Sequence, residues 1–90
     1  MDDLTGFQRD LLYVIAGADQ PSGQDIKSEI DQYYSSEINH GRLYPNLDTV
    51  VNKGLVEKGE LDRRTNYYAI TEDGEHAIED RQEWKSQYID

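Results

Sequence analysis

The sequence predicts one mainly α-helical domain that contains a small two-stranded β-hairpin. Two observations indicate this class. Apolar residues recur at helical spacing in three successive segments and again near the C-terminus, whereas a short stretch rich in Tyr, Val and Ile is divided by a polar turn. Ninety residues suffice for a single domain, although a core of this size gives marginal stability. The predicted order is three helices, a hairpin and a final helix.

The first two helices are predicted from their caps and their apolar faces. Thr5 stands three residues before Gln8, the spacing of a capping box, and the helix that follows is expected to end near Ala18. Its apolar residues are Phe7, Leu11, Val14, Ile15 and Ala18. Ser22 is a suitable N-cap for a second helix that ends near Tyr34. That helix carries on one face Ile26, Ile30 and Tyr33.

The third helix is predicted over residues 40–53, after a short polar connection (SSEINH). Its apolar stripe follows the helical period at Leu43, Leu47, Val50 and Val51. Pro45 lies close enough to the helix start to be tolerated, since first-turn amides have no acceptor within the helix. Gly54 supplies the C-terminal stop. The second and third helices therefore form a candidate helix-turn-helix.

A β-hairpin and a last helix complete the predicted order. Residues 56–61 and 66–70 are expected to form two short strands around the polar turn DRRT. Thr71 is a suitable N-cap, followed by acidic residues, for a helix that extends to about Tyr88. One face of this helix carries Ala77, Arg81, Trp84 and Tyr88, with Ile78 beside it. A hairpin after a helix-turn-helix is the arrangement of a winged helix-turn-helix domain.

Charge is distributed unevenly along the chain. The net charge is −10, from 19 acidic and 9 basic residues, of which only four are lysine. Residues 1–38 and 68–90 carry −6 and −5, whereas residues 39–67 carry +1. The basic residues of this middle segment are Arg42, Lys53, Lys58, Arg63 and Arg64. Because phosphate binding depends on lysine and arginine, this segment is the candidate for any contact with nucleic acid.

The acidic, lysine-poor composition has two interpretations. It suits a folded domain in a salt-rich cytoplasm, where ions screen the repulsion between carboxylates. The alternative is an ordinary acidic protein that binds other proteins. We prefer the first interpretation and expect an organism with a salty interior.

Several classes of protein and site are not supported by the sequence. There is no cysteine for a disulfide or a thiol metal site, and no apolar run approaches the roughly 20 residues of a membrane span. The N-terminus lacks the features of a signal peptide, so we expect a cytoplasmic protein. His40 and His76 lie far apart without a third ligand, and no glycine-rich phosphate loop is present. We therefore expect no metal, no cofactor and no enzymatic activity.

Four short motifs stand out along the chain: GRLYP (residues 41–45), KGLV (53–56), YY (67–68) and ITEDG (70–74). Together they resemble the PadR-like winged-helix transcriptional regulators, which have Leu-Tyr-Pro, Glu-Gly-Leu-Val, Tyr-Tyr and Leu-Thr-Glu-x-Gly at these positions. The segment SGQDIKSEI is similar to the family's His-Gly-Tyr-Glu-Ile segment, with Ser and Gln in place of His and Tyr. The match covers about residues 7–80. It implies a dimeric DNA-binding repressor of the short-tailed type, whose last helix makes much of the dimer contact.

The third helix would then be the recognition helix, which presents polar residues of its first turns to the major groove. Its candidates for DNA contact are Asn39, His40, Arg42, Tyr44, Asn46 and Thr49. We expect Arg42 to contact a guanine or a phosphate, Asn46 an adenine and Tyr44 a phosphate. Arg63 and Arg64 at the hairpin tip are expected on the flanking minor groove or backbone. Lys53 and Lys58 are weaker candidates for a backbone contact. For each residue the alternative is an ordinary solvated surface.

The last helix is expected to form a dimer with a second copy of the chain. Trp84 and Tyr88 are large residues near the end of a small domain, where little core remains to cover them. The predicted interface consists of Phe7, Leu11, Ala77, Arg81, Trp84 and Tyr88. The alternative is a helix that folds back on its own subunit. This divides the chain into a DNA-binding domain, residues 1–71, and a dimerisation helix, residues 72–90.

The sequence thus predicts a homodimeric transcriptional regulator that binds a pseudo-palindromic site in double-stranded DNA. The competing hypothesis is a winged helix that binds other proteins and no DNA. A third hypothesis is the sensing of a small aromatic effector at a dimer seam lined by Tyr and Trp. Of Tyr67 and Tyr68, which alternate faces, one is expected in the core and the other near the DNA or the dimer seam.

Overall fold

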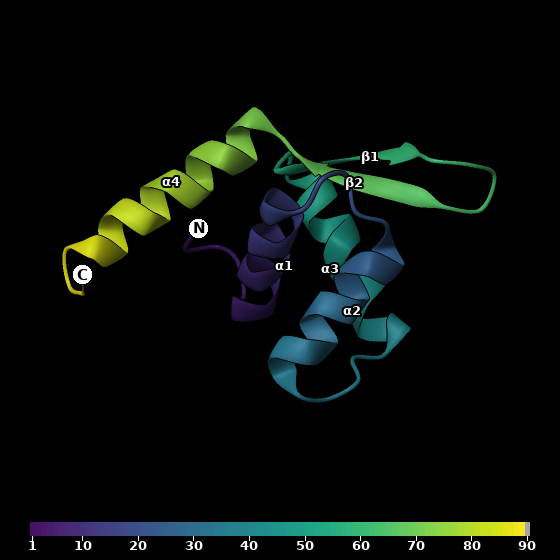
Figure 1. The fold of residues 1–90 in the computed structure, drawn as a ribbon. Coiled ribbons are helices and arrows are strands. Elements are labelled where there is room, and N and C mark those ends of the chain that lie inside the picture. Colours follow the sequence, from purple (N-terminus) through teal and green to yellow (C-terminus); the bar gives the residue numbers. More distant parts are fainter. Residues whose placement is uncertain (90) are drawn as a thin grey trace.

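The computed structural model describes residues 1–89. Within this range it contains helices α1 (Gly6–Gly17), α2 (Gly23–Tyr34), α3 (His40–Asn52) and α4 (Glu72–Ser86), with strands β1 (Val56–Glu60) and β2 (Asn66–Ile70) between α3 and α4. The predicted order is confirmed, although α4 ends before Tyr88. The predicted C-terminal segment ends at Asp90, which lies outside the described residues. Figure 1 shows α1, α2 and α3 packed together, with the hairpin and α4 extending from them in different directions.

The core lies between the first three helices and the inner side of the hairpin. Its fully buried side chains are Leu11, Leu12, Ile15, Ile26, Ile30, Leu43, Leu47, Val50, Val56 and Tyr68. Burial of one such aliphatic side chain contributes about 1.5–3 kcal/mol. Three of the four apolar positions predicted in α3 are therefore fully buried, and Val51 is half-buried. None of the helices within residues 1–89 has both the length and the apolar character needed to cross a membrane.

The helix starts agree with the predicted caps. Thr5 and Gln8 form the expected capping box, Ser22 and Asp25 form a second one, and the Thr71 hydroxyl accepts a hydrogen bond from the Gly74 amide. Gly54, which follows the C-cap residue Lys53 of α3, has φ +79°, a backbone conformation that glycine adopts readily. These local signals explain why the element boundaries were predictable.

One prediction for α2 is wrong. Tyr33 was expected on the apolar face of the helix, but its side chain is 78% exposed. Its neighbour Tyr34 packs inward instead, edge to face against Phe7, with ring centroids 5.8 Å apart. The reason is a partner on α1: the Tyr34 hydroxyl donates a hydrogen bond to the Asp10 carboxylate at 2.6 Å. The inward position of Tyr34 therefore satisfies both its ring and its hydroxyl.

The connection between α2 and α3 is held by a buried lysine and an aspartate. Lys27 is only 7% exposed, and its ammonium lies 2.8 Å from Asp31 and 3.5 Å from Glu37. The Asp31 carboxylate also accepts a hydrogen bond from the Ile38 amide at 2.8 Å. The hydrogen bonds from Lys27 and from Ile38 hold the pKa of Asp31 below its usual value. This cluster fixes the turn that orients α3 against α2.

The hairpin is an antiparallel pair in which Val56 faces Ile70 and Glu60 faces Asn66. Tyr68 is 1% exposed and belongs to the core, whereas Tyr67 lies across Gly59 on the opposite strand. The Tyr68 amide also donates to the Pro21 carbonyl at 2.9 Å, which ties β2 to the segment before α2. The hairpin is therefore anchored at its base, and its tip extends away from the helices (Figure 1).

Replacement of Gly74 by alanine is expected to destabilise the fold. Gly74 lies in the first turn of α4, and a Cβ there would collide with the backbone carbonyl of Leu55 and lie 2.6 Å from the Cδ1 of Ile70. We expect Gly74→Ala to lower the free energy of unfolding by about 1–3 kcal/mol, as in other overpacked sites. Urea unfolding measures this change. Gly17→Ala is the matched control, because a Cβ at Gly17 meets nothing within 4 Å; equal midpoints for the two variants would contradict the prediction.

Candidate nucleic-acid interface

The polar residues predicted for DNA contact lie on the outer side of α3. Asn39, His40, Arg42 and Tyr44 are exposed, and Asn46 and Thr49 are half-exposed. Asn39 also has a structural role, because its side chain caps α3 by accepting a hydrogen bond from the Arg42 amide at 2.8 Å. The remaining face of the helix carries the buried stripe. One side of α3 is therefore available for an external partner.

Arg42 is held on an aromatic platform. Its guanidinium carbon lies 4.1 Å from the centre of the Phe7 ring and 5.9 Å from the centre of the Tyr34 ring. Burial, followed by the hydrogen bond to Asp10, raises the pKa of Tyr34 to about 12, so the platform stays neutral. Arginine carries five N–H donors in a planar fork, which suits donation to a guanine or a phosphate.

The other polar residues of α3 have intramolecular partners. The Asn46 side chain donates to the Arg42 carbonyl at 2.7 Å and accepts from Gln8 at 2.9 Å, and the Thr49 hydroxyl donates to the Pro45 carbonyl at 3.0 Å. His40 packs edge to face against Tyr44, with centroids 5.6 Å apart. These contacts reduce the rotational freedom of the side chains before any ligand is present.

Tyr44 also packs closely against the start of α2. A Cβ at Gly23 would lie 2.6 Å from the Tyr44 hydroxyl oxygen, so glycine is required there unless the tyrosine moves. A hollow of about 340 Å³ lies beside this contact and is lined by residues of α2, α3 and the hairpin, including Tyr44 and Arg64. The hollow joins the exposed side of α3 to the wing, which is the hairpin of β1 and β2. No sequence pattern indicated that these two parts lie together.

Three lysines, Lys27, Lys53 and Lys58, form ion pairs with carboxylates. Lys53 lies 2.9 Å from Asp3, and Lys58 lies 3.9 Å from Asp48. The hydrogen bond from Lys53 lowers the pKa of Asp3. Among residues 1–89, by contrast, no arginine forms an ion pair within 4.0 Å. The positive charge that remains available for phosphates therefore comes mainly from arginines.

The wing tip presents Arg63 and Arg64, both exposed, from a turn stabilised by Asp62. The Asp62 carboxylate accepts hydrogen bonds from the amides of Arg64 and Thr65, at 2.9 and 3.0 Å. The backbone hydrogen bond from Arg64 is the main cause of the lowered pKa of Asp62. The turn is therefore ordered, and its two guanidinium groups extend into solvent.

The predicted dimer residues fall into two groups. Leu11 has no exposed surface and Phe7 is 7% exposed, so in this fold they belong to the subunit's own core and are not available to a partner. Ala77 and Arg81 are half-buried, whereas Trp84 and Tyr88 are 52% and 67% exposed. Trp84 packs edge to face with Tyr88, and Arg81 lies 5.6 Å from the Trp84 ring. Ile89, which is not among the predicted dimer residues, is 68% exposed.

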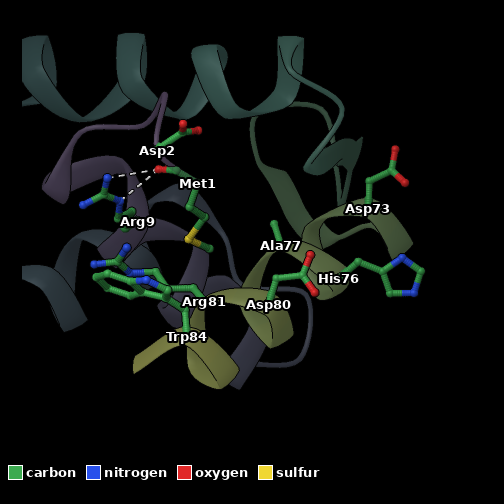
Figure 2. Close-up of a pocket in the computed structure, with 9 residues that line it drawn as sticks. All are labelled: Met1, Asp2, Arg9, Asp73, His76, Ala77, Asp80, Arg81 and Trp84. Carbon is green, nitrogen blue, oxygen red and sulfur yellow. Dashed lines mark hydrogen bonds between the residues drawn. The ribbon is translucent and has the colours of Figure 1, made fainter. Parts of the chain in front are cut away.

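A cleft of about 780 Å³ separates this part of α4 from the N-terminal segment and α1. Figure 2 shows Arg9, Arg81 and Trp84 at one end of the cleft, and Asp73 and His76 at the other end. Arg9 donates two hydrogen bonds to the Met1 carbonyl, at 3.1 and 3.0 Å, and so holds the N-terminus in place. The C-terminal half of α4 therefore has apolar surface that its own subunit does not cover.

The acidic and histidine side chains are dispersed over the described residues. Nowhere in the described range do three His, Asp or Glu side chains gather as ligands for a metal ion. The perturbed carboxylates Asp3, Asp31 and Asp62 each have a structural partner.

Comparisons with known proteins agree with a winged helix. Residues 11–80 match the family described as transcriptional regulator PadR-like. RosR of H. salinarum is 55% identical, with a TM-score of 0.90 over 97% of this chain and 79% of that chain. The complex structure of hsRosR-SG is 53% identical, with a TM-score of 0.93 over 99% of this chain and 79% of that chain. No curated protein matches significantly.

A more distant structure shares the fold alone. FabT of Streptococcus pneumoniae, solved in complex with DNA, is 18% identical, with a TM-score of 0.77 over 97% of this chain and 58% of that chain. The predicted winged-helix fold and the predicted resemblance are both confirmed by these matches. RosR comes from a halophilic archaeon, in agreement with the interpretation of the acidic composition.

Proposed function

The chain belongs to the transcriptional regulator PadR-like family, a family of DNA-binding dimers, and we propose that it represses transcription from a pseudo-palindromic site. One observation carries the proposal: α3 and the wing present three arginines, Arg42, Arg63 and Arg64, that have no carboxylate partner among residues 1–89, in a chain whose net charge is −10. A module that bound only proteins would have no need to gather arginines there. The family match also disfavours that alternative.

The proposed complex places the two copies of α3 in successive major grooves, roughly 34 Å apart. Arg42 and Asn46 contact base edges or phosphates, His40, Tyr44 and Thr49 contact the backbone around them, and Asn39 caps the helix. Arg63 and Arg64 contact the flanking backbone or minor groove, with a weaker contribution from Lys53, which must leave Asp3 to reach a phosphate. The acidic remainder of the surface points away from DNA, because carboxylates and phosphates repel each other.

The dimer is proposed to form through α4. Trp84 and Tyr88 project from the C-terminal half of the molecule without cover, and Ala77 and Arg81 lie on the same part of the surface. A second copy that packs there would remove the exposed aromatic surface from water. Residues 1–71 would then bind DNA, and the segment from residue 72 onward would join the subunits. We also propose a cytoplasmic location and no catalytic activity, in keeping with a transcriptional regulator.

Replacement of Arg42 tests base recognition directly. Cognate fragments are first recovered from genomic DNA by pull-down with the protein, and affinities are then measured by fluorescence anisotropy. Arg42→Ala should weaken cognate binding by about 1–3 kcal/mol if the guanidinium contacts a base edge, and should weaken binding to random DNA less. Arg42→Lys is the matched control. It retains the charge but loses the bidentate donor geometry. Compared with Arg42→Ala, it should therefore restore binding to random DNA without restoring the preference for cognate DNA. An equal loss on both DNAs would assign Arg42 to a phosphate.

A further inference from the structure

We propose that Gln8 of α1 is a positioning residue that fixes how Asn46 of α3 recognises a base. The proposal rests on the DNA-binding function proposed above and adds a residue outside the recognition helix. Gln8 is 8% exposed and lies under α3, so it does not itself reach a ligand on the outer face. Asn46 is half-exposed on that face. Gln8 therefore acts through Asn46.

Gln8 and Asn46 belong to a short chain of hydrogen bonds that connects two helices. The Gln8 Oε1 accepts from the Thr5 amide at 3.1 Å, and the Gln8 Nε2 donates to the Asn46 Oδ1 at 2.9 Å. The Asn46 Nδ2 donates in turn to the Arg42 carbonyl at 2.7 Å.

The direction of this chain is set by the backbone at both ends. A backbone amide only donates, so the Thr5 N–H requires the oxygen of Gln8 on its side. A carbonyl only accepts, so the Arg42 carbonyl requires the nitrogen of Asn46 on its side. The nitrogen of Gln8 must then face the oxygen of Asn46. No alternative orientation of either side-chain amide satisfies all three contacts.

This arrangement restricts what Asn46 offers to DNA. One of its two N–H groups and one lone pair of its oxygen are already used, so one donor and one acceptor remain. The donor lies on the side of Arg42 and the acceptor on the side of α1. A free asparagine can exchange these two groups by rotating its amide, whereas Asn46 presents them in one order only. A base edge with the opposite order of acceptor and donor is therefore disfavoured.

The first turn of α1 positions Arg42 in the same way. Phe7 and Gln8 are adjacent on α1, and Arg42 and Asn46 are one turn apart on α3. Phe7 supports the guanidinium at 4.1 Å from the ring centre, and Gln8 supports the amide at 2.9 Å. Two adjacent residues of α1 thus fix the positions of two candidates for base contact on α3. The Thr5–Gln8 capping box keeps that turn of α1 in place.

The isosteric substitution Gln8→Glu tests the proposal. Glutamate completes a capping box as well as glutamine does, so α1 is retained. Its carboxylate cannot donate, however, and Asn46 must turn its nitrogen toward α1 and leave the Arg42 carbonyl. Base preference is measured with wild-type protein, Gln8→Glu, Asn46→Ala and the double variant on DNAs that differ at one base pair. Each preference is a ratio of affinities, so the general effect of the added charge on DNA affinity cancels.

Asn46→Ala should lose discrimination at one position of the half-site, by about 2- to 10-fold for one hydrogen bond. Gln8→Glu should alter the preferred base at that same position and at no other. In the Asn46→Ala background, Gln8→Glu should have no further effect on the preference.

Gln8→Met provides a second, uncharged variant. It preserves the length of the side chain, but it removes both the donor to Asn46 and the acceptor of the Thr5 amide. Discrimination at the Asn46 position should fall in this variant too, with a circular dichroism spectrum like that of the wild type. Wild-type preference at that position in both folded Gln8 variants would overturn the proposal, as would unchanged preference in Asn46→Ala. Wild-type protein that binds no DNA would overturn the proposed function itself, which is a different result from binding with unchanged preference.

Discussion

Replacement of Arg63 and Arg64 together by alanine is expected to weaken binding to every DNA sequence, cognate or random, by about 10- to 100-fold at low ionic strength. The two guanidinium groups project from an ordered tip and form no ion pair with a carboxylate among residues 1–89. Contacts with phosphates carry no sequence information, so the preference for cognate over random DNA should remain unchanged. Fluorescence anisotropy with both DNAs measures the loss.

The double substitution Arg63→Lys with Arg64→Lys is the charge-matched control. Lysine also binds phosphate as a point charge, so this variant should keep most of the affinity, in contrast to the effect expected of lysine at Arg42. Alanine variants with wild-type affinity would show that the wing does not contact DNA.

The salt dependence of binding provides an independent measure of the same contacts. Each phosphate contact contributes about −0.9 to the slope of log affinity against log salt, so loss of both arginines should change that slope by about 2. In the wild type the acidic segments, residues 1–38 and 68–90, repel DNA at low salt. This repulsion should make the decline of DNA affinity with added salt shallow, or even reverse it. A steep decline into the molar range would contradict the interpretation of the acidic surface as an adaptation to salt.

Replacement of Trp84 and Tyr88 together by alanine is expected to dissociate the dimer. Both aromatic rings are more than half exposed in the subunit and contact each other at 5.3 Å between centroids. Aromatic residues at the centre of an interface commonly contribute 2 kcal/mol or more, so the dimer dissociation constant should rise at least about 30-fold. Sedimentation velocity over a range of protein concentrations measures the change. The resulting monomer should bind a single half-site more weakly than the dimer binds the full site.

Tyr33→Ala is the matched control for the dimer experiment. Tyr33 is an aromatic residue of α2 that is 78% exposed, but it lies outside the proposed interface. Its removal should leave the dimer dissociation constant unchanged. A dimer that survives the loss of Trp84 and Tyr88 unchanged would show that the subunits associate through another surface. Phe7 and Leu11 are unsuitable for this test, because both belong to the core.

The candidate site was predictable in part. Arg42, Arg63 and Arg64 stand out in sequence because they are basic residues in an acidic chain and occupy the first turns of a helix and the tip of a hairpin. From the sequence, Gln8 could be recognised only as a member of the capping box with Thr5. Its second contact, with Asn46, spans 38 residues of sequence. Lys53 and Asp3 are 50 residues apart. No local pattern indicates which distant side chains will meet.

Local signals in the chain were enough to specify its helices and hairpin. Thr5, Ser22 and Thr71 cap helices through hydrogen bonds to amides three residues ahead, and the stripe of α3 repeats within one or two turns. Such interactions join residues that are close in sequence, so the sequence alone indicates them. Tertiary packing alone decided that Tyr34 turns inward rather than Tyr33, and that Phe7 and Leu11 belong to the core. It also placed Phe7 and Gln8 under Arg42 and Asn46. These outcomes depend on which surfaces of α1, α2 and α3 meet. A side chain takes the position in which its apolar area is buried and its polar groups have hydrogen-bond partners.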